Sequence, residues 1–120
     1  MYVETDFILA LIKDDDWLSD RAEEIYRENS DELWTSEYTL IELMLIAYRE
    51  NKNTLRTVAE TIELVDVKGG TEKIESAALY VEEEGFTPFD ALHLASSQGE
   101  KIVSSDKSYD EFAERLALEK

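Results

Sequence analysis

Apolar and polar positions follow one another along this chain in short blocks, and their spacing predicts helices separated by short strands. Apolar residues three or four positions apart mark one face of a helix, whereas short apolar runs bounded by turn residues mark buried strands. The pattern predicts strands over residues 2–7, 32–36, 64–67, 102–104 and 116–118. It predicts helices over residues 17–29, 36–50, 54–62, 71–84, 88–99 and 109–114, and a helix that begins within residues 8–12.

Capping residues support several of these helix ends. Gly85 follows the helix over residues 71–84, where glycine readily adopts the left-handed conformation of a helix C-terminus. Thr87 and Pro88 form a helix start, since threonine can cap a helix and proline fits its first position. Ser36 is the corresponding N-cap candidate for the helix over residues 36–50.

The alternation of short strands with helices predicts an α/β fold with three layers, α/β/α, around a short central parallel sheet. Parallel strands need crossover connections, and the helices in these crossovers cover both faces of the sheet. The 120 residues, of which 43% are hydrophobic, suit one domain spanning residues 1–120. In such sheets ligands bind beyond the carboxyl ends of the strands, and we expect the chemistry there.

Composition narrows the class of protein. The chain has no cysteine, which excludes a disulfide scaffold, a thiolate zinc site and a cysteine nucleophile. The N-terminus carries acids where a signal peptide would carry lysines. The longest apolar runs are far shorter than the roughly 20 residues of a membrane-spanning helix. These features favour a soluble, cytoplasmic protein that is not associated with a membrane.

The formal net charge of −17, from 29 acidic and 12 basic residues, is the most unusual bulk property. A surface this acidic repels polyanions, so a broad nucleic-acid-coating role is not expected. Three explanations stay open: a halophilic adaptation, since about 1 M salt shortens the Debye length to about 3 Å; a basic partner protein; and a divalent-metal site for the acids that converge. The following basic residues are scattered and form no evident stripe: Lys13, Arg21, Lys101 and Lys107.

Glu4 and Asp6 lie in the first predicted strand, two residues apart, so both side chains would point to the same face. Two like charges on a buried strand are costly unless a partner neutralises them. The alternative is that the strand ends early and both carboxylates are solvated.

Glu42 is the one charged residue between Leu40 and Ala47, so it projects from a helix that is apolar on all sides. Buried without a partner, this carboxylate would cost several kcal/mol. The alternatives are a position at the rim of the core or an ion pair with Arg49.

Asp90 and Asp106 add acids at a helix start and a strand end. Asp90 lies three residues after Thr87, where an acid also stabilises a helix through its dipole. Asp106 directly follows a buried strand, in a turn where aspartate is common for structural reasons. His93, one turn after Asp90, could reach the same place or be a half-buried structural residue. Taken together, the acids predict one cluster of carboxylates, which suits Mg²⁺ or Mn²⁺ and not zinc.

Four blocks of the sequence, in their order and spacing, resemble the PIN-domain family. The blocks are YVETD, TSEYTLIELM, TPFDALHLA and KIVSSDKSYDEF, and the likeness covers essentially the whole chain. The blocks around Asp90 and Asp106 are the most specific. Within the family the chain most resembles the small VapC-type toxins, which are ribonucleases inhibited by a partner antitoxin.

The resemblance implies a PIN-like nuclease domain: a metal-dependent endoribonuclease with Mg²⁺ or Mn²⁺ as cofactor, RNA as substrate, an antitoxin as partner, and a homodimer. Asp6 or Glu4, together with Asp90, would hold the principal metal. Asp106 would support that metal or a second ion. Glu42 would hold a water on the metal or assist its deprotonation.

Two positions depart from the family pattern. The first block usually contains Asp-Thr-Asn or Asp-Thr-Ser, whereas Glu4 stands at the aspartate position of this chain and Asp6 at the polar one. The longer Glu4 side chain shifts a ligand oxygen by about one C–C bond, so Asp6 would take over coordination. Ser108 stands where the family often has a further acid, two residues after Asp106. These departures bear on activity more than on the fold.

Two other functions stay open on the sequence alone. A non-catalytic interaction module with a decayed metal site is motivated by Glu4 and Ser108. A phosphorylatable receiver domain has a similar length and is also acidic. Asp66 would be its phosphoacceptor, although Lys107 matches the lysine of that fold poorly.

Overall fold

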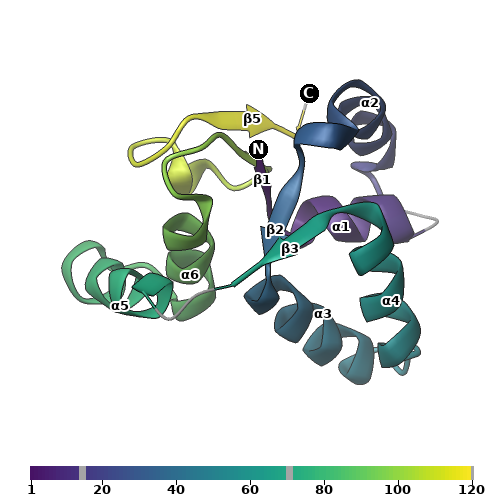
Figure 1. Cartoon of the computed structure of the whole chain (residues 1–120), viewed down its shortest axis with the longest axis horizontal. Helices are drawn as coiled ribbons and strands as arrows, with labels where there is room; N and C mark the ends of the chain where they lie inside the picture. The colour runs from purple at the N-terminus through teal and green to yellow at the C-terminus, as the bar shows by residue number, and fades with distance from the viewer. Residues whose placement is uncertain (14–15, 70–71, 120) are drawn as a thin grey trace.

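The computed structural model describes residues 1–13, 16–69 and 72–119, and its centre is a five-stranded sheet (Figure 1). All neighbouring strands are parallel, in the order β3-β2-β1-β4-β5. The strands are short: β1 Tyr2–Val3, β2 Trp34–Ser36, β3 Asp66–Lys68, β4 Ile102–Ser104 and β5 Arg115–Ala117.

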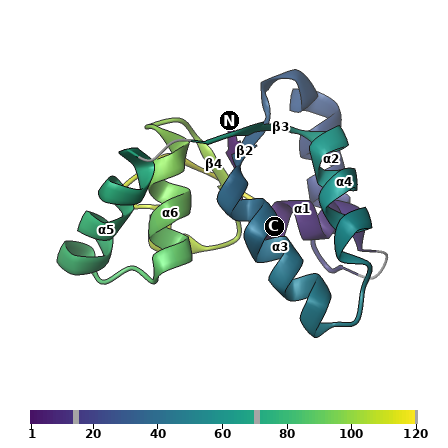
Figure 2. The same cartoon turned by 60° about the horizontal axis from the view of Figure 1, so that its bottom comes forward.

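Pairs of helices connect the first four strands. The helices are α1 Thr5–Ile12, α2 Ser19–Asn29, α3 Glu37–Arg49, α4 Thr54–Leu64, α5 Glu72–Glu84 and α6 Pro88–Ser97, with 3₁₀ turns η1 Ser30–Glu32 and η2 Lys107–Tyr109. Helices α1 to α4 lie on one side of the sheet, and α5 and α6 lie on the other (Figures 1 and 2). This arrangement confirms the predicted three-layer α/β/α fold. Among the described residues, no helix combines the length and apolar character needed to cross a membrane.

The direction in which the chain winds across the sheet reverses once, and open parallel sheets typically have a ligand-binding crevice at such a reversal. From β1 the chain moves outward through β2 to β3, then returns past β1 to β4 and β5. Because crossovers between parallel strands are right-handed, the reversal places α5 and α6 on the opposite face. Ligands in such sheets bind outside the carboxyl ends of the strands at the reversal. In this chain those strands are β1 and β4, which are direct neighbours.

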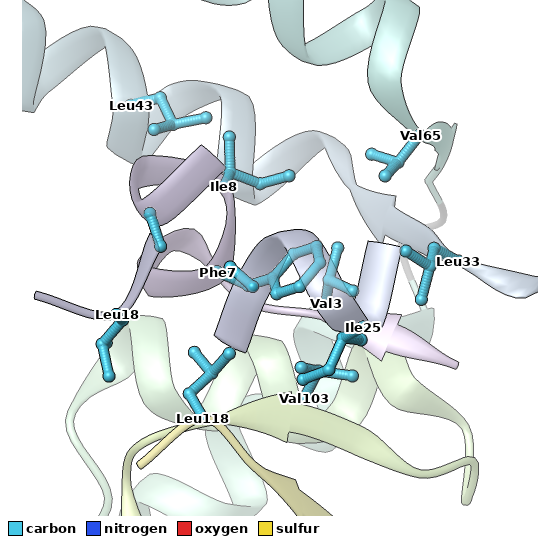
Figure 3. Packing of buried hydrophobic residues seen from close by; sticks show 12 residues of the cluster. Val3, Phe7, Ile8, Leu18, Ile25, Leu33, Leu43, Val65, Val103 and Leu118 are labelled. Carbon is cyan, nitrogen blue, oxygen red and sulfur yellow. The ribbon is translucent and has the colours of Figure 1, made fainter. Parts of the chain in front are cut away.

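The two central strands are buried on both faces. Val3 and Val103 are paired and belong to the larger apolar core, together with residues of α1, α2 and α3 (Figure 3). Tyr2 and Ile102 are also paired and belong to a smaller core that includes α6. All four side chains are fully buried. The carboxyl ends of β1 and β4 are therefore held in place by apolar packing on both faces of the sheet.

The first strand is shorter than predicted, and this changes how two acids are placed. β1 ends at Val3, Glu4 occupies the N-cap of α1 with an extended backbone, and Asp6 lies in the first helical turn. The backbone amides of Phe7 and Ile8 already bond to the carbonyl oxygen of Glu4. The prediction that Glu4 and Asp6 share one face of a strand was therefore wrong.

The other elements lie close to their predicted ranges, with differences near the C-terminus. The segment predicted as a helix over residues 109–114 is not a helix: only Tyr109 belongs to the 3₁₀ turn η2, and residues 110–114 lie in turns and irregular structure. The last strand begins at Arg115, one residue early. Gly85 adopts the expected positive φ, +74°. Thr87 lies at the N-cap of α6, but its side chain makes no capping hydrogen bond. The expected helix start at residue 71 lies outside the described residues.

The strand order contradicts the receiver-domain alternative. Receiver domains have the order 2-1-3-4-5, whereas this sheet has the order 3-2-1-4-5. Asp66 is the exposed first residue of the edge strand β3, far from the carboxyl end of a central strand where a phosphoacceptor would be needed.

Replacing a core isoleucine tests the packing of α2 against the sheet. Ile25 of α2 is 1% exposed, whereas Ile62 of α4 is 55% exposed. We expect Ile25→Ala to lower the free energy of unfolding by about 2–5 kcal/mol, because it leaves a cavity. The matched helical substitution Ile62→Ala should cost less than about 0.5 kcal/mol. Urea unfolding followed by circular dichroism measures both values, and equal losses would contradict the burial of α2.

Candidate metal centre

Acids from four parts of the chain come together at the carboxyl ends of β1 and β4, the expected place of the crevice. Glu4 directly follows β1, and Asp106 comes two residues after the end of β4. Glu42 projects from α3, and Asp90 lies in the first turn of α6. The fold thus brings together side chains that are far apart in the sequence.

Serine hydroxyl groups connect the two acids at the start of α1. Ser104 Oγ donates to Glu4 Oε2 at 2.7 Å and lies 3.3 Å from Asp6 Oδ2. Asp6 Oδ2 also accepts from the backbone amide and the hydroxyl of Ser105, at 2.9 and 2.7 Å. Glu4 and Asp6 therefore meet at the end of β4, because the first turn of α1 carries Asp6 back toward it.

Glu42 is held by two donors at one of its oxygens. The Thr5 hydroxyl donates to Glu42 Oε1, and His93 Nε2 lies 3.0 Å from the same oxygen. The Glu42 side chain is 25% exposed, whereas His93 is fully buried. The expected alternative of an ion pair with Arg49 is not formed within the described residues; Arg49 Nε donates to the Leu45 carbonyl oxygen instead.

Asp90 and Asp106 are half-buried neighbours of this group. The Tyr109 hydroxyl lies 3.5 Å from Asp90 Oδ1. Burial raises the pKa of Tyr109, and the charges of Glu4, Asp90 and Asp106 raise it further. Asp106 Oδ1 accepts from the Ser108 amide at 2.9 Å and so caps η2. Asp106 therefore uses one oxygen for its own turn, as the structural alternative predicted, while it faces the same tyrosine as Asp90.

Burial and mutual repulsion oppose the ionisation of the two acids at the start of α1. Burial, and next the charge of Asp6, raise the pKa of Glu4 from 4.5 to about 9, and Asp90 and Glu42 add weaker repulsion. Burial also raises the pKa of Asp6, despite the hydrogen bonds from Ser105. These two carboxyl groups would release protons readily only if a positive charge entered the crevice.

Glu42 behaves in the opposite way. Partial burial raises its pKa, but the hydrogen bonds from His93 and Thr5 outweigh this effect, and the net pKa is lowered. Glu42 is therefore an anion near neutral pH. Of the carboxyl groups in the crevice, it is the one whose hydrogen bonds favour the charged form most clearly.

From the sequence alone His93 is a secondary candidate, whereas in the structure it contacts the central residues of the site. Its ring nitrogens contact Glu42 on one side and the Tyr2 hydroxyl on the other. The signal in the sequence is one polar ring inside the apolar block ALHLA of α6. That signal cannot distinguish a core histidine from a functional one, because its partners come from β1 and α3. Ser104 and Ser105 were missed because serine at or directly after the end of a strand also fits an ordinary turn.

The donor set of the crevice suits a hard divalent cation. One oxygen of Glu4, one oxygen of Glu42 and a ring nitrogen of His93 lie within 4.8 Å of one another. Asp6 Oδ1 is buried and has no hydrogen-bond partner in the described part of the chain. A buried oxygen without a partner is costly, and a cation would supply the missing interaction. The residues therefore fit Mg²⁺ or Mn²⁺.

The raised pKa of Glu4 predicts how stability without metal depends on pH. The folded state holds the Glu4 proton up to about pH 9, whereas the ordinary value is 4.5. Between these values the folded state binds more protons than the unfolded state, so the free energy of unfolding falls as pH rises. We expect wild-type protein in EDTA to be more stable at about pH 5 than at about pH 8, with a flatter profile in Glu4→Gln.

Urea unfolding at a series of pH values measures both profiles. The general repulsion of an acidic surface acts on wild type and variant almost equally, so the difference between them isolates Glu4. Parallel profiles would show that Glu4 ionises without cost in the folded state.

The comparison with protein families gives a match over nearly the whole chain. A family model described as the PIN domain matches residues 1–115. No curated protein sequence matches the chain.

Solved structures share the fold at low sequence identity. VapC20 of Mycobacterium tuberculosis, described as a sarcin-ricin loop cleaving toxin, is 17% identical, with a TM-score of 0.76 over 92% of each chain. A chain of a toxin–antitoxin complex from Klebsiella pneumoniae is 15% identical, with a TM-score of 0.76 over 98% of this chain and 96% of that one. A chain of DNA-bound VapBC from Salmonella typhimurium is 17% identical, with a TM-score of 0.75 and the same coverage. With the family match over residues 1–115 and this shared fold, the chain belongs to the PIN domain family.

Proposed function

We propose that this protein is a metal-dependent endoribonuclease that hydrolyses RNA phosphodiester bonds, and that it is the toxin of a toxin–antitoxin pair. The observation that carries the nuclease part is the convergence of Glu4, Asp6, Glu42 and Asp90 at one place, where Asp6, Asp90 and Glu42 each add to the repulsion that Glu4 experiences. The toxin part is supported by the fold shared with VapC20 and with the two toxin–antitoxin complexes.

Each acid has a proposed role that follows from its contacts. Glu4 and Asp6, which share the Ser104 hydroxyl, would hold the principal Mg²⁺ or Mn²⁺ together with Asp90. Asp106, with one oxygen committed to η2, would support that ion or a second one. When bound, the cation would supply hydroxide near neutral pH and offset charge on the phosphate oxygens.

Glu42 is suited to move a proton. Within the described residues, both hydrogen bonds to its carboxylate end on Oε1. Oε2 is then available to accept a proton from the attacking water, and the lowered pKa keeps the group anionic before that step. A carboxylate that is held at one oxygen and ionised at neutral pH would act as a general base toward a water that lies within hydrogen-bond reach of its free oxygen.

The acidic protein surface offers few positive charges to bind the phosphates of RNA. Three cations that could meet phosphate are already paired with acids: Lys13 with Glu50, Arg21 with Glu24 and Lys101 with Glu114. We therefore expect binding to depend on the metal, on high salt, or on a groove formed with a second copy. The family resemblance supports a homodimer, and light scattering coupled to size exclusion would detect one.

Glu4 favours a second candidate, a non-catalytic interaction module. The longer side chain at this position, and a serine at position 108, depart from the usual family pattern. Calorimetric titration separates the two functions: Mn²⁺ binding supports the nuclease, and no binding at millimolar concentration supports the decayed module.

Removing the charge of Asp90 tests the nuclease directly. We expect wild-type protein to cleave single-stranded RNA in the presence of Mn²⁺, and EDTA to abolish cleavage. Asp90→Asn should reduce the rate by about 100-fold or more, since the crevice loses a charged ligand. Asp66→Asn is the matched control, because Asp66 is exposed on the edge strand β3 and should keep wild-type activity. Robust cleavage by Asp90→Asn would end the assignment.

The net charge of −17 predicts a salt response. Raising KCl from about 0.1 M to about 2 M should raise the midpoint of thermal unfolding and should not lower RNA cleavage, because salt screens the repulsion among surface acids. Differential scanning fluorimetry and the cleavage assay measure the two responses. A steep fall of activity at molar salt would contradict the halophilic interpretation.

A further inference from the structure

The chain has one histidine, and it joins three elements beneath the acidic crevice. His93 of α6 is fully buried. The Tyr2 hydroxyl of β1 lies 2.5 Å from His93 Nδ1, and Glu42 of α3 lies 3.0 Å from His93 Nε2. The Tyr2 hydroxyl also bonds to Ser36 Oγ at 2.9 Å. A continuous path of hydrogen bonds therefore runs from β2, through β1 and α6, to the carboxylate on α3.

The partners of His93 define which ring nitrogen carries the proton. An ionised carboxylate only accepts hydrogen bonds, so Nε2 must donate to Glu42. In a neutral imidazole, Nδ1 is then an acceptor, and the Tyr2 hydroxyl fills it as a donor. Burial raises the pKa of Tyr2 to about 12, which keeps that hydroxyl protonated.

This arrangement orients Glu42 from its buried side. His93 Nε2 and the Thr5 hydroxyl both act on Oε1, so Oε2 is left for the crevice. The carboxylate is held beside Glu4, with which it shares the 4.8 Å grouping of ligand atoms. A carboxylate on an exposed helical side chain without such donors would sample several rotamers.

We propose that His93 is a positioning residue that acts through Glu42, and that Tyr2 sets its tautomer. The proposal rests on the ribonuclease function proposed above and deepens it: Glu42, the proposed general base, needs a hydrogen bond from a buried donor to hold its orientation. Outer partners of this kind fix the orientation of ligand carboxylates and typically affect metal affinity by about 10–100-fold. The competing arrangement, in which Nε2 itself binds the cation, requires the opposite tautomer.

Nuclear magnetic resonance of the ¹⁵N-labelled protein tests the tautomer without any activity measurement. With a single histidine, the two-bond ¹H–¹⁵N spectrum contains one set of imidazole signals. We expect Nε2 at a protonated shift and Nδ1 at an unprotonated shift near neutral pH, and Nε2 should stay protonated when Mg²⁺ is added. A protonated Nδ1, or loss of the Nε2 proton on adding Mg²⁺, would overturn the proposal.

Substitutions at His93 test whether the donor at Nε2 is what matters. The amide of His93→Gln can reach the position of Nε2, whereas the shorter His93→Asn reaches only the position of Nδ1. Calorimetry with Mg²⁺ should show a loss of about 10–100-fold for His93→Asn and a clearly smaller loss for His93→Gln. In RNA cleavage, kcat should fall in the same order with KM nearly unchanged. Equal losses in both variants would indicate a packing role only.

Tyr2→Phe provides a milder test if the buried His93 variants fail to fold. Removing the hydroxyl should raise the share of the Nδ1-protonated tautomer and weaken Mg²⁺ binding. Tyr26→Phe is the control: it makes the same change of side chain and removes the hydrogen bond from the Tyr26 hydroxyl to the Leu64 carbonyl oxygen, but Tyr26 has no contact with His93 in the described part of the chain. Tyr26→Phe should leave the imidazole signals and the Mg²⁺ affinity unchanged. An unchanged imidazole spectrum in Tyr2→Phe would refute the role given to Tyr2.

Failure of the ribonuclease proposal would look different. A protein that neither binds Mg²⁺ nor cleaves RNA would still report its tautomer in the spectrum. If it binds Mg²⁺, a double-mutant cycle shows whether His93 acts through Glu42: His93→Asn should cost little further affinity in a Glu42→Ala background. Full additivity of the two losses would mean that His93 acts independently of Glu42.

Discussion

Repulsion between buried carboxylates is the constraint on which this crevice depends. Glu4 and Asp6 approach the same serine hydroxyl. Glu4 is buried, and Asp6 is half-buried with its Oδ1 atom shielded from water. The folded chain tolerates them because Ser104 and Ser105 donate hydrogen bonds to them and because the raised pKa of each group favours its neutral form. The same repulsion makes the crevice receptive to a divalent cation, because an ion of opposite charge removes the cost of burial and the cost of repulsion together.

The sheet makes this repulsion possible by holding the acids in place. Strands of two or three residues could not by themselves fix side chains at their ends. They do so because β1 and β4 are packed on both faces and are neighbours at the point where the winding reverses. Arg115 of β5 adds to this edge by donating to the Ser104 carbonyl oxygen and pairing with Asp110 and Glu119. The backbone that carries the acids is therefore held in place by packing, while their carboxyl groups share few hydrogen-bond donors.

Much of the architecture could be predicted from the sequence. The order of strands and helices, the helix start at Pro88 and the strand before Asp106 follow from local pattern and capping residues, which act over a few positions. The end of β1 could not be located, because residues 2–8 contain two apolar pairs on either side of three polar residues, a pattern that fits one strand as well as a short strand followed by a helix. Burial of both Phe7 and Ile8 reflects contacts with α2 and α3 that no local window contains.

Some residues of the candidate site could also be predicted from the sequence, and others could not. The acids are recognisable because charge in an apolar context is rare and costly. The groups that control them are not recognisable, because serine, threonine and histidine have ordinary structural roles at the same positions. Ser104, Thr5 and His93 gain their meaning from partners on other elements. A single sequence does not reveal which residues distant in the chain become hydrogen-bond partners.

The hydrogen bond between Ser104 and Glu4 limits which substitutions the chain tolerates at these two positions. The longer acid at position 4 reaches a hydroxyl across the strand pair, so the two positions form one unit. Replacing Glu4 by aspartate alone would shorten the side chain and leave the Ser104 hydroxyl without this acceptor. Replacing Ser104 alone would leave the Glu4 carboxyl group with one hydrogen-bond donor fewer. We therefore expect the residues at positions 4 and 104 to vary together among related sequences.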